Sequence, residues 1–154
     1  MIERDMQLAL YYRHRSSACA ILPNYTPPWW YECDLYVVMK SMRSVEYEIK
    51  TTRGDFRADV GKREKHARLS KLGLAGSTPT RFFFVVPEGL VTADEVPTYA
   101  GLMYARPNPS YKRASLTIIR RAPRLSGKKL TEKTIREMHR ISYYRFWNLK
   151  ARLT

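Results

Sequence analysis

The segment "RFFFVVP", residues 81–87, limits the fold more than any other part of the sequence. Both of its alternating faces are apolar, which is typical of a strand buried in the middle of a sheet with helices on either side. Two segments before it, "CDLYVVMK" (33–40) and "VEYEIKTT" (45–52), are rich in β-branched and aromatic residues, and the short turn "SMRS" separates them. We therefore expect a strand pair next to a buried central strand.

Helical segments are expected before, between and after these strands. Apolar residues recur near helical spacing in "MIERDMQLALYYRHR" at the start of the chain. Asp55 is a predicted N-cap for a helix over about 56–72, and Thr131 for a last helix ending near Leu153. An edge strand and two later strands are expected in "CAILPNYTPPWW", "TYAGLMYA" and "ASLTIIRRA". This order predicts one α/β domain with a mixed sheet over residues 1–154.

The charge balance points to a polyanionic partner. Lys and Arg number 28 against 14 Asp and Glu, a net charge of +14, which favours nucleic acid over an anionic membrane. A membrane-spanning helix is not expected, because no run of about 18 apolar residues exists. The N-terminal segment lacks the apolar core of a signal peptide. Cys19 and Cys33 have no C-x-x-C partner, so we expect reduced thiols in a cytoplasmic protein.

The strand pair carries the candidate chemistry. Side chains alternate across a strand, so Asp34 lies on one face of the first strand, and Glu48 and Lys50 share a face of the second. If the turn places Lys40 opposite Ser44, Asp34 faces Lys50 and Glu48 becomes its diagonal neighbour. A slip of one residue would separate the two carboxylates, because it would turn one of them to the other face.

Such a pair of carboxylates suits a hard divalent cation. Like charges repel, and a cation between them relieves the repulsion. Mg²⁺ prefers a few carboxylate oxygens, a carbonyl and several waters, so Asp34, Glu48 and the Ile49 backbone carbonyl are the predicted ligands. Mn²⁺ accepts the same oxygens. Lys50 is expected beside a water bound to the metal ion. There it would orient that water or help to deprotonate it, and it would stabilise charge on a phosphate oxygen.

Asp34, then Glu48-Ile49-Lys50 on the next strand, and then a basic helix resemble the PD-(D/E)xK nuclease superfamily. The segments "VEYEIKTTRGDFRAD", "FFFVVPEGL" and "VPTYAGLMY" are also similar to a subset of small DNA-repair and phage-encoded members. The resemblance implies a restriction-endonuclease-like α-β-β-β-α-β core over about 2–87, with a C-terminal elaboration over about 98–153. It also implies that Asp34, Glu48 and Lys50 are catalytic. Cys33 stands where the family motif has Pro.

Accessory and binding residues follow from the resemblance and from the basic segments. Glu3 matches an extra acid that some members use, and Lys62 or Lys65 matches a Gln or Lys near the scissile phosphate. The predicted nucleic-acid-binding residues lie on the helix after the motif and in the loop at 120–129: Arg53, Arg57, Lys62, Arg63, Lys65, His66, Arg120, Arg121, Lys128 and Lys129. A solvated basic face is the alternative interpretation of this charge run.

Two aromatic segments allow alternatives. Trp29 and Trp30, beside two prolines, are expected to pack within a loop, and base stacking is the alternative. In "YYRFWNLKARL" of the last helix, Phe146 and Leu149 are expected to be buried, and a dimer face is the alternative.

The expected function is metal-dependent hydrolysis of phosphodiester bonds in nucleic acid, with DNA favoured over RNA by the resemblance. We expect the protein in the cytoplasm of a bacterial or phage-infected cell. A homodimer is also expected, because two copies could cut the two strands of a duplex. The rival class is a non-catalytic nucleic-acid-binding protein that retains the fold. A third class is a ribosome- or RNA-associated domain, which predicts no clustering of Asp34 with Glu48.

Overall fold

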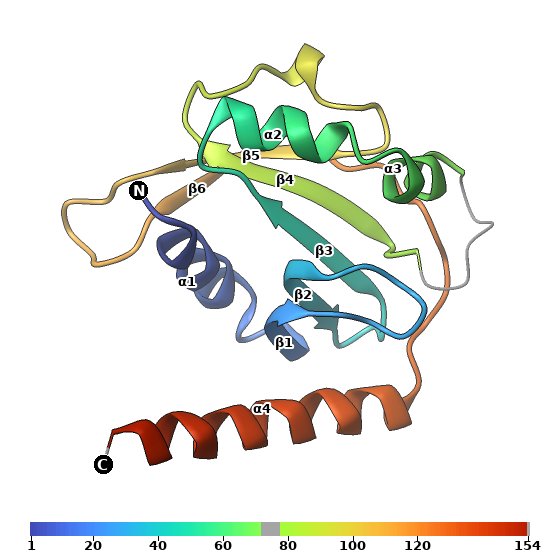
Figure 1. Ribbon diagram of the computed structural model, residues 1–154, viewed down its shortest axis with the longest axis vertical. Coiled ribbons are helices and arrows are strands. Elements are labelled where there is room, and N and C mark those ends of the chain that lie inside the picture. The colour runs from blue at the N-terminus through green and yellow to red at the C-terminus, as the bar shows by residue number, and fades with distance from the viewer. Residues whose placement is uncertain (72–77, 154) are drawn as a thin grey trace.

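The computed structural model describes residues 1–71 and 78–153. Its elements, in chain order in Figure 1, are α1 (Glu3–His14), β1 (Ala18–Tyr25), β2 (Cys33–Met39), β3 (Ser44–Ile49), α2 (Arg53–Val60), α3 (Arg63–Ser70), β4 (Arg81–Pro87), the short 3₁₀-helix η1 (Ala93–Glu95), β5 (Gly101–Arg106), β6 (Ser115–Arg120) and α4 (Glu132–Arg152).

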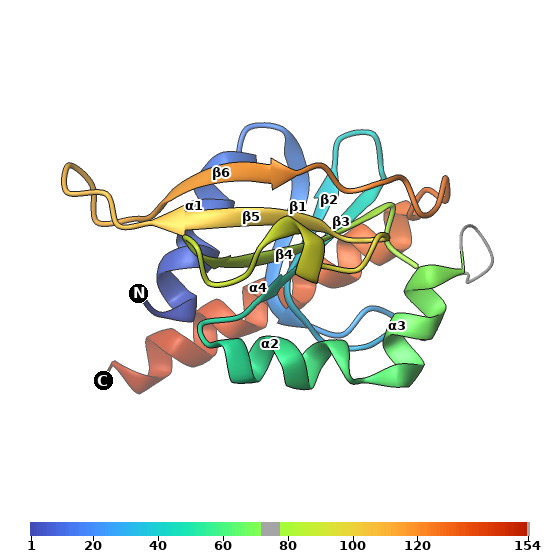
Figure 2. The same ribbon diagram turned by 90° about the horizontal axis from the view of Figure 1, so that it is seen from above.

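One six-stranded sheet organises the fold, in the order β1-β2-β3-β4-β5-β6. The first three strands are antiparallel, β4 runs parallel to both β3 and β5, and β6 is antiparallel to β5. Figure 2 shows the twist expected of such a sheet, since β1 and β2 are steeply inclined to β5 and β6. The structure confirms a single α/β domain with a mixed sheet, in which β4 is an interior strand.

The two sheet faces bury different helices. Alternation in β4 turns Phe83 and Val85 to one face and Phe82 and Phe84 to the other. The first face packs on α1 through Met6, Ala9 and Leu10, which recur at helical spacing. The second face packs on Phe56 of α2, Leu69 of α3, and Ile135 and Met138 of α4.

The predicted helix over 56–72 is two helices. Thr52, and not Asp55, caps α2, because its hydroxyl accepts a hydrogen bond from the Asp55 N–H at 3.1 Å. The chain leaves the helix at Gly61, a residue with low helix propensity, and resumes in α3. Leu72, the predicted end, lies outside the described residues.

The last helix begins as predicted, with the Thr131 hydroxyl accepting from the Thr134 N–H at 3.3 Å. α4 lies along edge strand β1, where His139 contacts the Cys19 carbonyl at 2.7 Å and Arg145 donates to the Asn24 carbonyl at 2.8 Å, and its last turns extend past the sheet (Figure 1). Phe146 and Leu149 are therefore exposed, and the expectation that they are buried is wrong.

The predicted register of the strand pair is also wrong, by two residues. Tyr36 pairs with Glu46 and Val38 with Ser44, so Lys40 does not face Ser44. The Met39 N–H bonds the Arg43 carbonyl at 2.9 Å across a three-residue loop, whose last residue, Met42, has a φ of 67°. A shift of two residues keeps every side chain on its predicted face.

Two glycines give a matched test of the packing. A Cβ on Gly101, at the start of β5, would lie 2.4 Å from the Phe83 ring and 2.8 Å from the Ala122 backbone nitrogen, and the backbone cannot swing away. We expect Gly101→Ala to lower the free energy of unfolding by about 1–3 kcal/mol. Gly54→Ala in α2 meets nothing closer than 3.8 Å and should be neutral or stabilising by up to about 1 kcal/mol. Urea denaturation of both variants measures the difference, and equal stabilities would contradict the packing.

Candidate functional site

The site lies where β2 and β3 separate. The last pair between these strands is Leu35–Tyr47. Beyond it, the Ile49 N–H donates to the Asp34 carboxylate, Oδ2, at 2.6 Å instead of to a backbone carbonyl. The side chain of Asp34 thus replaces the next rung of the ladder and is fixed beside the end of β3. The sequence signal was the alternation of both strands, which placed Asp34 and Glu48 together despite the wrong register.

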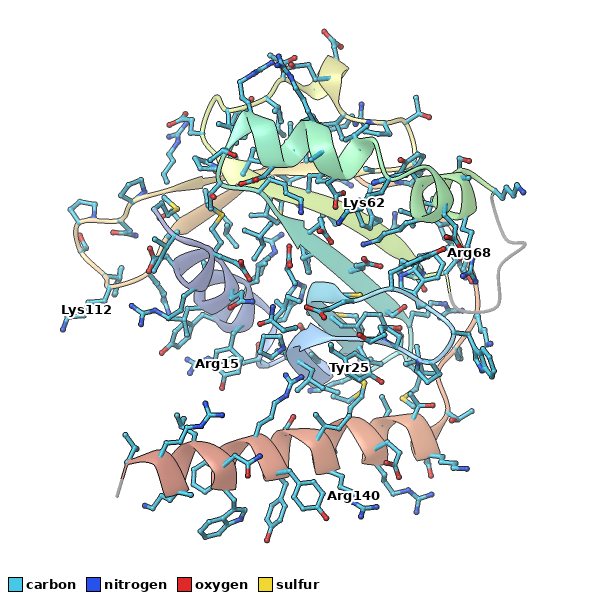
Figure 3. All side chains as sticks on the ribbon, viewed as in Figure 1. Arg15, Tyr25, Lys62, Arg68, Lys112 and Arg140 are labelled. Carbon is cyan, nitrogen blue, oxygen red and sulfur yellow. The ribbon has the colours of Figure 1, made fainter. Side chains whose placement is uncertain are left out.

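A hollow of about 310 Å³ opens at this point, and its lining comes from α1, the ends of β2 and β3, and α2. Lys50 lies directly after β3, and its Nζ is 2.7 Å from Glu48 Oε1 and 3.3 Å from Asp59 Oδ1. Figure 3 shows Lys62 at the junction of α2 and α3, over the sheet. The lining residues with charged side chains are Glu3, Asp34, Lys50, Asp55, Asp59 and Lys62.

Electrostatics separate the two key groups. Burial, and next the neighbouring Glu48 charge, raise the pKa of Asp34 from 3.8 to about 6, although the Ile49 N–H and Lys50 oppose the shift. Burial lowers the pKa of Lys50, but the charge of Glu48 and its hydrogen bond outweigh burial, so the net pKa is raised. Lys50 is therefore an ammonium ion at neutral pH. Asp34 is a carboxylate at that pH, but the positive charge near it is too small to offset burial and the Glu48 charge.

A buried ion cluster stands behind the hollow. Lys65 of α3 is 5 % exposed, and its Nζ lies 2.7 Å from Glu46 Oε1 and 3.1 Å from Glu48 Oε2. The Trp30 indole N–H donates to Glu46 Oε2 at 2.7 Å. Burial raises the pKa of Glu46, while Lys65 and the Trp30 hydrogen bond oppose the rise. Alternation along β3 puts Glu46 on the same face as Glu48, but it gives no sign that Glu46 and Lys65 are buried partners.

A second chain of contacts holds Lys50 from the other side. Asp59 is 1 % exposed, and its Oδ2 lies 3.1 Å from His66 Nε2, while His66 Nδ1 is hydrogen-bonded to the Tyr99 hydroxyl. Burial raises the pKa of Asp59. The hydrogen bond from His66 and the charges of the neighbouring lysines lower this pKa by more than burial raises it, so it lies well below the ordinary value. Asp59 is thus a buried acid and not a surface residue of the helix. Its position three residues after Phe56, on the core face of the helix, is the signal that could have found it.

The structure separates the predicted nucleic-acid-binding residues into two groups. Lys65 and His66 are buried in the clusters above, and the half-buried Arg120 guanidinium donates to the backbone carbonyls of Ala93, Val96, Pro97 and Ala100. These three side chains are engaged in internal hydrogen bonds and ion pairs, so they are poorly placed to bind a phosphate.

The second group remains at the surface. Arg53 is exposed but ion-paired with Glu95, and the side chain of Arg63 lies outside the described part of the chain. Arg57, Arg121, Lys128 and Lys129 are exposed and make no ion pair within the described part of the chain, whereas the exposed Lys62 pairs with Asp59 at 3.4 Å.

The oxygen donors at the site meet part of what a divalent cation needs. Among the residues that the structure describes, no group of three or more His, Cys, Asp or Glu side chains is arranged to hold a metal ion. Mg²⁺, however, keeps several waters and binds proteins through one or two carboxylates together with substrate phosphates. Asp34 and Glu48 fit that requirement by chemistry and position. Glu48 must loosen its contacts with Lys50 and Lys65 to take part, because both of its oxygens are engaged.

Comparison with known proteins supports the fold and goes no further. No protein-family model matches the chain, and no curated protein matches it. Among solved structures, it is similar to the SPO1766 protein of unknown function from Silicibacter pomeroyi. The TM-score is 0.59 at 19 % sequence identity, over 94 % of this chain and 85 % of that one. Within residues 1–71 and 78–153, no helix has both the length and the apolar content to cross a membrane.

The raised pKa of Asp34 predicts a change in stability with pH. Protonated Asp34 favours the folded state, so this contribution is complete below pH 3.8 and is lost as the pH rises to about 6. Asp34→Asn keeps an acceptor for the Ile49 N–H and removes the charge. In EDTA at pH 8 we expect it to raise the free energy of unfolding by about 1–2 kcal/mol, with no gain at pH 3.

Denaturation with urea at both pH values measures this, with the exposed Asp94→Asn as the control. A destabilised Asp34→Asn at pH 8 would show that the hydrogen bond to Ile49 outweighs the repulsion.

Proposed function

We propose that this protein is a metal-dependent nuclease of the PD-(D/E)xK type that hydrolyses phosphodiester bonds, in DNA before RNA. The observation that supports it most is the position of Asp34 and Lys50 in one hollow where β2 and β3 separate, with Glu48 ion-paired to Lys50 beside it. The element order also agrees with the restriction-endonuclease-like core, since a helix and three antiparallel strands are followed by helices and by β4 parallel to β3.

Asp34 and Glu48 would hold Mg²⁺ or Mn²⁺, with the Ile49 carbonyl as a further donor. The cation, when bound, would lower the pKa of water and neutralise charge on the phosphate. Lys50 keeps its proton, so its Nζ would donate to a phosphate oxygen or orient the attacking water, and it is less suited to act as the base. Asp59 would keep Lys50 in place, and Lys62 would meet the phosphate at the mouth of the hollow.

The net charge of +14 would supply salt-sensitive affinity that does not depend on base sequence. The proposed compartment is the cytoplasm, and a homodimer is the proposed arrangement for cutting two strands. The second candidate is a non-catalytic nucleic-acid-binding protein. It is favoured by one observation, that Lys50 and Lys65 already neutralise both oxygens of Glu48.

Cleavage of labelled single-stranded, duplex and branched DNA, and of RNA, separates the two candidates. We expect cutting with Mg²⁺ or Mn²⁺, none in EDTA, and a loss of about 100-fold or more in Asp34→Asn and Lys50→Met. The control is Lys112→Met, which removes an exposed lysine on a distant loop (Figure 3) and should cut like the wild type. Salt-sensitive binding without cutting under any metal would replace the nuclease by the binding protein.

A further inference from the structure

A second hollow, of about 170 Å³, lies on the same side of the sheet as Glu46 and Glu48. Tyr36, which pairs directly with Glu46, and Ser44, two residues before Glu46 on β3, both line it. Tyr25 and Thr78 complete a buried wall of four hydroxyl-bearing side chains. Figure 3 shows Tyr25 between β1 and α4, so the hollow lies between the sheet and the start of α4.

One of these hydroxyls, that of Thr78, has no hydrogen-bond partner among the described residues. Thr78 is 4 % exposed, and its Oγ1 makes no hydrogen bond within the part of the chain that the structure describes. An unpaired buried hydroxyl costs free energy unless a ligand or water satisfies it. Thr78 lines the hollow, so an occupant with polar atoms could supply the missing hydrogen bond.

The rim of the hollow carries an exposed aromatic ring. Trp29 lines it and is 88 % exposed, so its indole gains little from packing and the expectation of a loop-packing role is wrong. The backbone of Trp29 has a φ of 60°, a value that residues other than glycine rarely adopt. An exposed, strained tryptophan at the mouth of a pocket is suited to stacking on a planar ring.

The charge around the rim is positive. Lys128 and Lys129 line the hollow together with Thr131, the N-cap of the 21-residue helix α4, whose N-terminus favours an anion. A planar ring against Trp29 and a phosphate against these groups are the two parts of a nucleotide. The volume is below the 300–1,000 Å³ typical of whole-ligand sites, so the hollow suits one unit of a longer strand.

The distance between this hollow and the candidate active site can be spanned by a short single strand of nucleic acid. Ser44 and Glu48 are four residues apart on β3, which is about 13 Å at about 3.3 Å per residue. A stacked strand covers that distance in about four nucleotides, at about 3.4 Å each.

We propose that this hollow is a nucleotide subsite, in which Trp29 stacks on one base of a single strand and Lys128 and Lys129 bind its phosphate, about four nucleotides from the scissile bond. The subsite rests on the proposed function for its substrate. Its binding, however, is measurable without any cleavage.

The test is fluorescence anisotropy with end-labelled oligothymidylates of two to twelve nucleotides, in EDTA. We expect wild-type affinity to rise steeply once the strand is long enough to reach both sites. Trp29→Asn removes the ring but tolerates the positive φ, and should lose about tenfold in affinity for the longer strands. The double variant Lys128→Ala/Lys129→Ala should lower the slope of log affinity against log salt by about one.

Tyr111→Ala, which removes an exposed ring from the β5–β6 loop, is the matched control and should bind like the wild type. A Trp29→Asn protein with wild-type affinity and length dependence would overturn the subsite, even if cleavage that requires Asp34 is observed. A tenfold loss in Trp29→Asn and no cleavage by any form would retain the subsite and reject the nuclease.

Discussion

The buried ammonium of Lys65 is the interaction on which the site most depends. It joins α3 to β3 through two carboxylates, and without it Glu46 and Glu48 would be like charges about two strand residues apart in the core. Removing one partner of such a cluster leaves an uncompensated buried charge, which is why the arrangement constrains the sequence of both elements. Trp30 extends the constraint to the β1–β2 loop by its hydrogen bond to Glu46.

The same cluster suggests how the proposed cation site would stay folded before a cation binds. Lys65 and Lys50 each take one oxygen of Glu48. Among the described residues, only the Ile49 N–H donates a hydrogen bond to the Asp34 carboxylate, which lies beside the Glu48 charge. The negative charge that is least compensated by positive partners is therefore that of Asp34, at the open side of the cluster. A divalent cation entering there would first meet Asp34, and Glu48 would join it by loosening its contacts with Lys50 and Lys65.

The sequence predicted the strands and their faces better than the contacts that the strands and helices make with one another. Alternation in β2 and β3 placed Asp34 and Glu48 on compatible faces, and the apolar "RFFFVVP" marked the interior strand, because both signals are local. The register, the break at Gly61 and the burial of Lys65, Asp59 and His66 depend on contacts between distant elements, which no local pattern records. The exposed Trp29 was misread for the same reason, since its loop turns the ring outward.

The most direct test of the account is a titration with Mn²⁺, followed by the loss of the free-ion signal in electron paramagnetic resonance. The central claim is that Asp34 and Glu48 form one divalent-cation site. It predicts one bound ion per chain in the wild type, none in Asp34→Asn or Glu48→Gln, and unchanged binding in Asp94→Asn. Failure of the folded wild type to bind Mn²⁺ at millimolar concentration, or equal binding by Asp34→Asn, would contradict it.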